Sequence, residues 1–155
     1  MIGRVATLAL GAAMLAGSAS ALTCEEDSVL VTGGFGQARF AAQIADEPAE
    51  RSKGLMFVEE MGTLEGMLFL YDAPQHATFW MRNTLIPLDM LFADETGTIT
   101  HIHENAVPMD ETVIDGGRDV LAVLEINGGM AARLGIAEGD RLHHPLLGGT
   151  CPPSE

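Results

Sequence analysis

Positive charge is scarce in this chain of 155 residues. There are 8 Lys and Arg residues against 22 Asp and Glu residues, which gives a formal net charge of −14 at pH 7. Such an excess opposes the approach of phosphate backbones and anionic membrane surfaces through long-range repulsion. We therefore expect no nucleic-acid partner, and we attribute the acidity to solubility outside the cytoplasm rather than to the recruitment of a cationic partner.

The sequence also has little that suggests a nucleophilic hydrolase or a nucleotide-binding protein. Beyond residue 21 its serines are Ser28, Ser52 and Ser154, and none of them lies in a Gly-x-Ser-x-Gly motif. The Gly-Gly-Phe-Gly run at residues 33–36 lacks the Lys and Ser or Thr that complete a phosphate-binding loop. This run instead predicts a turn between two strands.

A long apolar run occurs at the N-terminus and is not followed by a second one. Arg4 precedes apolar residues 5–17, and the small residues 18–21 end in an Ala19-x-Ala21 site. This pattern predicts a signal peptide over residues 1–21 that is cleaved after about Ala21, because the run is shorter than the ~20 residues that span a bilayer. A membrane anchor or a lipoprotein modified at Cys24 fits less well. We expect a periplasmic or secreted protein without stable membrane insertion.

Cysteine is limited to two residues, Cys24 and Cys151, which lie near the two ends of the exported chain. In an oxidising compartment, such a pair predicts a disulfide that ties the termini together. The alternative is two free thiols, which is unusual in an exported protein.

Short apolar runs separated by Gly, Pro and Asp predict the fold. Their spacing is typical of a single compact antiparallel β-sandwich or barrel. Two segments, residues 46–54 and 129–135, carry helix start and stop signals and predict one or two short helices, with Asp46 as the first N-cap. Residues 94–97 predict a hairpin turn. The expected strands contain residues 29–31, 38–45, 66–71, 77–81, 86–93, 98–103, 120–126 and 141–146.

The most distinctive segment is residues 79–89, which places polar side chains within an apolar stretch and contains the only tryptophan. Strand alternation puts Trp80 and Arg82 on one face, where they suit stacking and the bidentate capture of a carboxylate. Asn83 and Thr84 provide short polar side chains at a predicted turn. Together with Arg51 and Asp89, these four residues are the candidate ligand-binding set.

Asp89 lies in a part of this segment that is otherwise suited to burial. A buried carboxylate needs a cation or several hydrogen-bond donors. We expect Arg51 or Arg82 as the cation and Asn83 and Thr84 as the nearest donors. Asp89 then serves mainly to lock the turn, and a ligand-facing or catalytic role is the alternative.

Two histidines raise the question of a metal site. His101 and His103 occupy alternate positions of one predicted strand, so both imidazoles could reach one metal ion. A third ligand is not evident. His76, Glu104 and Glu125 are candidates only on a guess that they lie nearby. We therefore expect solvent-facing histidines, no metal and no cofactor, and we assign the seven methionines beyond residue 21 to core packing rather than to copper.

Four sequence blocks resemble the family known as domain of unknown function 192. They are Glu50-Arg51-x-x-Gly54-Leu55-Met56, Gly66-Met67-Leu68-Phe69, the long block Phe79-Trp80-Met81-Arg82-Asn83-Thr84-x-Ile86-Pro87-Leu88-Asp89-x-x-Phe92, and Leu124-Glu125-x-x-x-Gly129 followed by Gly135-Ile136-x-x-Gly139-Asp140. The resemblance covers residues 38–147, which leaves an N-terminal segment at 22–37 and a tail at 148–155 with Cys151. It implies a compact β domain, often exported, with no established biochemical activity.

Three functional hypotheses follow. The first is a non-catalytic module of the cell envelope that binds a small molecule such as a carboxylate, a glycan or a peptide end, or a protein partner of the envelope. The second is a hydrolase or lyase that uses Asp89 with an arginine, or a metal-dependent activity that uses His101 and His103. The third is a purely structural domain of an envelope assembly.

Overall fold

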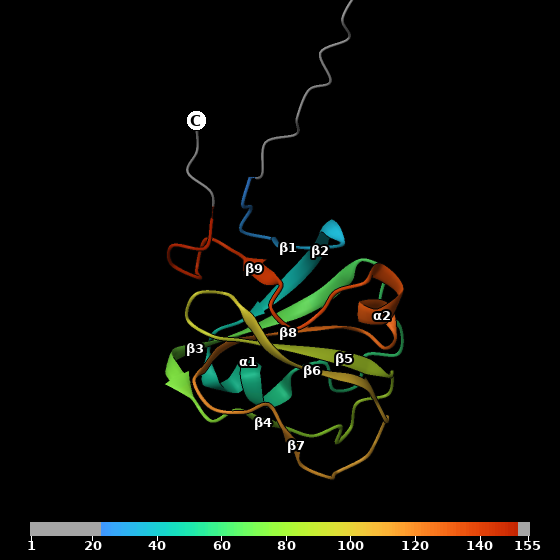
Figure 1. The fold of residues 1–155 in the computed structure, drawn as a ribbon. Helices are drawn as coiled ribbons and strands as arrows, with labels where there is room; N and C mark the ends of the chain where they lie inside the picture. Colours follow the sequence, from blue (N-terminus) through green and yellow to red (C-terminus); the bar gives the residue numbers. More distant parts are fainter. Residues whose placement is uncertain (1–22, 152–155) are drawn as a thin grey trace, which may run out of the picture.

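The computed structural model describes residues 23–151, so the predicted signal peptide at residues 1–21 lies outside the described part. The fold is mainly β, with a curled seven-stranded sheet and two short helices, as predicted (Figure 1). The elements are β1 (Ser28–Gly33), β2 (Gly36–Ala45), α1 (Pro48–Lys53), β3 (Glu65–Gln75), β4 (Thr78–Phe79), β5 (Leu88–Ala93), β6 (Ile99–Ala106), β7 (Ile114–Asp115), β8 (Val120–Asn127), α2 (Met130–Leu134) and β9 (Arg141–His143).

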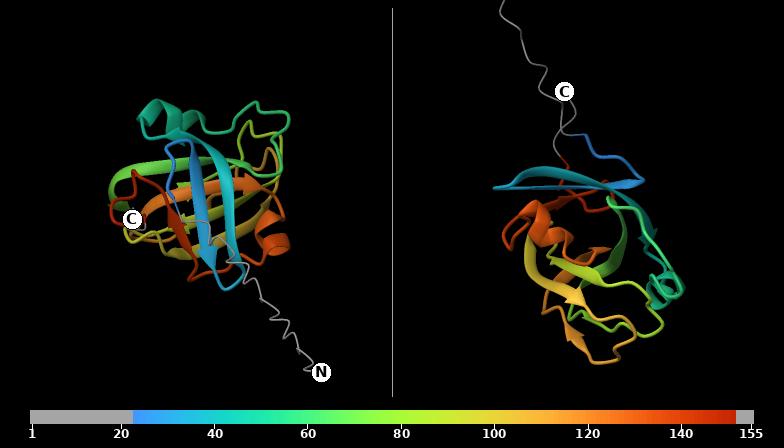
Figure 2. Two further views of the ribbon diagram at one scale, coloured as in Figure 1. Left: turned by 90° about the horizontal axis from the view of Figure 1, so that it is seen from above. Right: turned by 90° about the vertical axis from the view of Figure 1, so that its right-hand side faces the viewer.

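The large sheet has the strand order β6-β5-β8-β3-β2-β1-β9, and β4 pairs with β7 in a separate two-stranded ribbon. The strands curl around a central core, as the two views in Figure 2 show. One end of β6 reaches β9, where a bridge joins Thr98 to Arg141 and the Ile99 N–H donates to the Asp140 carbonyl over 2.8 Å. These contacts bring the two edges of the sheet together on that side.

One strand pair departs from the predicted antiparallel arrangement. β2 and β3 are parallel, with Ala41 opposite Glu65 and Ala45 opposite Phe69, whereas the other pairs are antiparallel. Parallel neighbours need a crossover connection, and the segment with α1 provides it. This connection carries α1 across the sheet.

The sheet has apolar side chains on both faces, and they form two clusters. Alternation along the strands puts Leu68, Leu91 and Leu124 inside the curl, in what we call the inner core. Met67 and Phe69 point the other way with Met90, Phe92 and Val123, into the outer core. The outer core is covered by α1, the loop after it, and the segment around β4 and β7, which lie away from β1 and β9 in Figure 1.

Helix α1 begins one residue later than predicted. Its N-cap is Glu47 rather than Asp46, and Glu47 and Glu50 form a capping box, with the Glu47 N–H donating to the Glu50 carboxylate over 3.2 Å. Pro48 starts the helix, where its missing N–H costs nothing. Gly54 ends it at a φ of 50°, so the chain turns back toward the sheet.

Both predicted turns are present. Gly33 pairs with Gly36 across the β1–β2 turn, and the Gly97 N–H donates to the Asp94 carbonyl over 3.0 Å in the hairpin between β5 and β6. A Cβ on Gly97 would lie 2.3 Å from the Leu142 carbonyl oxygen, so only glycine fits this hairpin beside β9. The sequence did not predict the two-residue strand β7.

Asp89 lies on β5 with its side chain in the inner core, and it is fully buried. One carboxyl oxygen accepts hydrogen bonds from the backbone N–H groups of Asn105 and Gly129, and the other accepts from Ala131, each over 2.8 Å. The donors are backbone amides from the end of β6 and the start of α2, rather than the arginine, asparagine and threonine side chains expected. Asp89 therefore holds three segments together.

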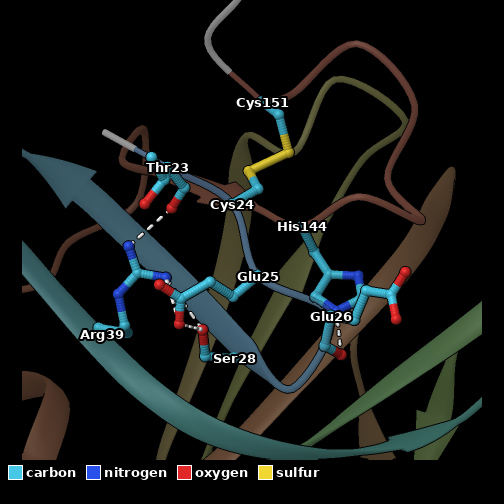
Figure 3. Close-up of polar contacts among 8 residues, drawn as sticks. All are labelled: Thr23, Cys24, Glu25, Glu26, Ser28, Arg39, His144 and Cys151. Carbon is cyan, nitrogen blue, oxygen red and sulfur yellow. Dashed lines mark hydrogen bonds and ion pairs between the residues drawn. A yellow bond between two sulfur atoms is a disulfide. The ribbon is translucent and has the colours of Figure 1, made fainter. Parts of the chain in front are cut away.

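The chain ends are tied at the β1 and β9 side of the molecule (Figure 3). Cys24 and Cys151 form a disulfide with their Cα atoms 5.9 Å apart, as predicted. Beside it, the Arg39 guanidinium donates to the Thr23 carbonyl over 2.7 Å and to the Ser28 hydroxyl over 2.9 Å. Several independent contacts thus fix the N-terminal segment against the sheet.

His144 adds to this clamp from within the core. Its Nδ1 accepts the Leu146 N–H over 3.2 Å, so Nε2 must carry the proton that is donated to the Glu26 carbonyl over 3.1 Å (Figure 3). Burial lowers the pKa of His144, and the hydrogen bond to Glu26 acts against that shift. This neutral imidazole joins the segment after β9 to the N-terminal segment.

Within residues 23–151, no helix is long and apolar enough to cross a membrane.

Replacing Asp89 with Asn should destabilise the protein by about 1.5–3 kcal/mol. The amide has one acceptor oxygen where the carboxylate has two, so its NH2 group would face a backbone N–H and leave that donor without an acceptor. The midpoint of urea unfolding measures the effect. Asp72→Asn, an exposed change on β3, serves as the control and should leave the midpoint unchanged. Equal midpoints for the two variants would contradict the assigned role of Asp89.

Replacing both cysteines with serine should lower the free energy of unfolding by about 2–5 kcal/mol, since the bridge restricts the unfolded chain over a separation of 127 residues. Wild-type protein unfolded in the presence of a reductant should match the double variant. A double variant as stable as the oxidised wild type would show that the bridge does not stabilise the fold.

Candidate functional site

A cavity of about 290 Å³ lies over the outer face of the sheet, between α1 and the segment that contains β4. Small-ligand pockets begin at about this size. Exposed residues surround its mouth, whereas Phe69 and Glu125 come from the buried strands β3 and β8. The lining residues are Arg51, Ser52, Lys53, Gly54, Leu55, Met56, Phe69, Tyr71, Thr78, Phe79, Trp80, Thr84 and Glu125.

Glu125 is the acidic side chain of this cavity. It lies on β8 between Met67 of β3 and Met90 of β5, and only 4% of the residue is exposed. Its carboxyl group forms no hydrogen bond with residues 23–151. Within that range, every side-chain nitrogen or oxygen that is fully enclosed has a hydrogen-bond partner, so the Glu125 carboxyl group is not fully enclosed. The carboxyl group therefore reaches the cavity and is not sealed among the methionines.

Burial raises the pKa of Glu125 to about 8, because the charged form loses its hydration and gains no donor. Glu125 is consequently a neutral acid at pH 7 that can donate a hydrogen bond. Burial is also the largest cause that raises the pKa of Tyr71. Glu125 adds to this shift, while a hydrogen bond with Gln75 and the charge of Arg51 oppose it. The cavity lining thus includes two uncharged groups, Glu125 and Tyr71.

Arg51 stands at the cavity wall, where α1 faces β3. Its Nη1 donates to the Leu70 carbonyl over 2.8 Å and to the Asp46 carbonyl, and its Cζ lies 5.5 Å from the centroid of the Tyr71 ring. Within residues 23–151, the structure shows no acceptor at Nε or Nη2. Arg51 therefore both fixes α1 and keeps one edge of its guanidinium available to a ligand.

Trp80 forms part of the mouth and is 45% exposed. The Arg82 guanidinium lies beside it, with Cζ 5.4 Å from the ring centroid. The sequence predicted this contact from strand alternation, but β4 ends at Phe79 and both residues lie beyond it. Phe79 points the other way and contacts Phe69 and Phe92 edge to face, with centroids 5.1 and 5.7 Å away. Phe79 anchors the segment, so that Trp80 is held at the cavity.

The turn after Trp80 is shaped by unusual backbone angles. Asn83 adopts a φ of 54°, and two flanking residues that contact the turn through their backbone, Phe57 and Met109, have φ values of 67° and 65°. Asparagine tolerates a positive φ, but Phe57 and Met109 do so at a cost, and strained residues of this kind gather at functional sites. Thr84 is buried and lines the cavity.

The structure therefore brings some of the six candidate residues together and not others. Arg51, Trp80 and Thr84 line the cavity, and Arg82 stacks on Trp80 outside it. Asn83 donates weakly to the Met56 sulfur over 3.9 Å, at the edge of the site. Asp89 lies on the opposite face of the sheet, in the inner core.

His101 and His103 are placed apart from this cavity. His101 stacks on Phe92 with the ring centroids 5.8 Å apart, and its Nδ1 lies 3.2 Å from the Glu138 carboxylate. His103 lines a separate hollow near residues 104–114. Within residues 23–151, no group of three or more His, Cys, Asp or Glu side chains could hold a metal ion.

The sequence analysis proposed Glu125 only as a possible third metal ligand, and it did not name Tyr71. A signal was available for Glu125, because it is the only charge in the apolar run 120–126, which is the argument that singled out Asp89. The side chains now in place can stack an apolar ring, attract an anion and donate a hydrogen bond from a neutral acid.

Glu125→Gln should remove a pH dependence of stability. A carboxyl group whose pKa rises on folding from 4.5 to about 8 stabilises the folded state most below pH 4.5, and this contribution falls by about 1.4 kcal/mol per pH unit until pH 8. Urea midpoints between pH 6.5 and 8 should therefore decline in the wild type more steeply than in the variant. The contribution of His144, whose pKa is lowered by burial, is the same in both proteins, so the difference between the two curves reports Glu125. Parallel curves for the two proteins would contradict the burial of a neutral Glu125.

Comparisons with known proteins address the family. Residues 30–144 match the model of the DUF192 family, described as Uncharacterized ACR. The chain is similar to a solved protein of unknown function from Novosphingobium aromaticivorans DSM 12444, with 46% identity, a TM-score of 0.74, and coverage of 86% of this chain and 99% of that one.

A second solved structure, a putative transcription regulator from Sinorhizobium meliloti 1021, is 39% identical with a TM-score of 0.74, and the match covers 80% of this chain and 97% of that chain. No curated protein matches. With the fold, the order of the sequence blocks and the family match in agreement, this chain belongs to the DUF192 family.

Proposed function

We propose that this protein is a non-catalytic module of the cell envelope that binds a small molecule in the cavity between α1 and β4. The observation that carries the proposal is Glu125, a buried carboxyl group that faces this cavity without a hydrogen-bond partner among residues 23–151. Because the carboxyl group is reached from the cavity, its proton is available to an acceptor atom of a bound molecule. A hydrogen bond of this kind would contribute to binding.

The shape and lining of the cavity support the same proposal. Trp80 and Phe79 supply aromatic surface, and Arg51 and Lys53 supply charge near the mouth. Apolar walls with a few convergent polar groups are typical of small-molecule sites. The Phe57 N–H donates to the Asn83 carbonyl over 2.8 Å, which joins the two neighbouring loops and favours a preformed site.

The structure supports ligand binding in the cavity better than a hydrolase or lyase reaction that uses Asp89. Both carboxyl oxygens of Asp89 accept backbone hydrogen bonds, and the residue is fully buried on the other face of the sheet. A general acid or base must come within hydrogen-bond reach of its substrate. Asp89 is therefore a structural residue in this proposal.

The proposed location in the periplasm or outside the cell rests on two features. Residues 1–21 have the pattern of a signal peptide, and the Cys24–Cys151 disulfide ties the chain ends. Disulfides persist in oxidising compartments. An exported protein would meet its small ligand in the periplasm or outside the cell.

Trp80 offers a direct test, because it is the only tryptophan and lies in the cavity wall. We expect a saturable change in its fluorescence with small carboxylates, sugars or dipeptides screened separately. Calorimetry on Trp80→Ala should then show binding weakened about tenfold through lost stacking and apolar contact.

Leu64→Ala is the matched control for Trp80→Ala, since Leu64 is 45% exposed like Trp80 but lies outside the cavity lining. It should bind the same ligand as the wild type does. The proposal fails if none of the three ligand classes binds, or if Trp80→Ala and Leu64→Ala bind equally well.

A further inference from the structure

The charge of the cavity differs from that of the whole chain. The protein carries 22 acidic and 8 basic residues, whereas the cavity lining contains Arg51, Lys53 and a single acidic residue, Glu125. Because Glu125 is neutral at pH 7 through burial, the lining is positive where the protein is negative. A local positive field of this kind concentrates anions.

Arg51 provides the geometry to hold such an anion. Its Nη1 is used by the Asp46 and Leu70 carbonyls, so the Nε–Nη2 edge remains for a ligand, as described above for residues 23–151. Two parallel N–H groups on one edge match the two oxygens of a carboxylate. The bonds from Nη1 and the contact with Tyr71 hold this edge in place before a ligand arrives.

Glu125 provides the second polar contact, at the base of the cavity. Arg51 lies on α1 and Glu125 on β8, so the two groups line the cavity from different elements. The titratable groups that line the cavity with Glu125 are Tyr71 from β3 and the two bases of α1, Arg51 and Lys53. The lining residues from the 78–84 segment carry no titratable group, and neither does Met90, which lies opposite Glu125 on β5.

Much of the remaining lining is apolar. Phe69, Leu55 and Phe79 line the cavity, so an inorganic anion would leave this surface without contact. Burying an apolar ligand body there contributes roughly 25 cal/mol per Å² of surface removed from water. The lining therefore favours an organic anion over phosphate or sulfate alone.

We infer that the ligand is a small organic carboxylate whose anionic end binds the Nε–Nη2 edge of Arg51, whose apolar body lies against Trp80 and Phe79, and whose other end accepts a hydrogen bond from the protonated carboxyl of Glu125. This inference rests on the proposed function of the cavity and names its ligand class. Lys53 adds charge at the mouth. Ionisation of Glu125 removes the donor and places a buried negative charge in the same space.

The test uses Trp80 fluorescence and three probes that space the two polar ends differently: 4-hydroxybenzoate, 4-hydroxyphenylacetate and 3-(4-hydroxyphenyl)propionate. At least one should bind to the full chain without its signal peptide at pH 7. The corresponding neutral amide should bind at least about tenfold more weakly, because it cannot form a charge-assisted bidentate pair. Sodium phosphate should produce no saturable change.

Two variants separate the roles of the bases. Arg51→Lys keeps a charge but loses the paired donors and should weaken the best probe about tenfold. Lys53→Met leaves the contacts of Arg51 intact and should weaken binding of the best probe about threefold. This second variant keeps the test open if Arg51→Lys does not fold. Arg133→Met, an exposed change on α2, is the control and should bind as the wild type does.

Glu125→Gln tests the proton donor, since its amide still donates but does not ionise. Wild-type affinity for the best probe should fall up to tenfold per pH unit above pH 8, while the variant should bind equally at pH 7 and pH 9. Equal affinity for acid and amide, or wild-type binding that does not change between pH 7 and pH 9, would overturn the inference. The binding of uncharged sugars with none of these carboxylates would also overturn it, yet would leave the proposed cavity function standing.

Discussion

The apolar outer face of β3, β8 and β5 is the constraint on which the rest of the site depends. A second full sheet does not cover it; the cover consists of α1, the loop after it and the segment around β4, which meet over the strands. Phe79 fills the space above Phe69 and Phe92. Short segments of this kind leave a gap where they meet, and the gap is the cavity over Glu125.

Two acidic residues one register step apart show how the environment decides a role. Asp89 lies opposite Ile126 and Met90 lies opposite Glu125, so the two carboxyl groups point to opposite faces of the sheet. Asp89 accepts three backbone hydrogen bonds and joins β5, β6 and α2. Glu125 has apolar neighbours, and its burial keeps the carboxyl group protonated at pH 7, so it can donate a hydrogen bond into the cavity. One group holds the fold and the other is available to a ligand.

All strands except the two-residue β7, both helices and both turns could be predicted because alternation and capping residues are local signals. The parallel pairing of β2 and β3 was missed, although a helix between two strands is its usual sign. The hydrogen-bond partners predicted for Asp89 were wrong for a physical reason. The actual donors are backbone amides, and every residue except proline has one, so the residue types in the sequence do not indicate which amides will bind. Trp80 and Arg51 were placed in the candidate site from the sequence, whereas Tyr71 became evident only once α1 was seen to pack across β3.

The position of Glu125 also bears on why the site has this form. Its two register neighbours are Met67 and Met90, so an apolar side chain at residue 125 would complete the outer core and remove the cost of burying a carboxyl group. Arg51 shows the opposite arrangement, since two of its N–H groups stabilise α1 while its other edge stays free. Stability alone explains Arg51 but not Glu125. A side chain that weakens the core and faces a cavity is where selection for binding, rather than for folding, would act.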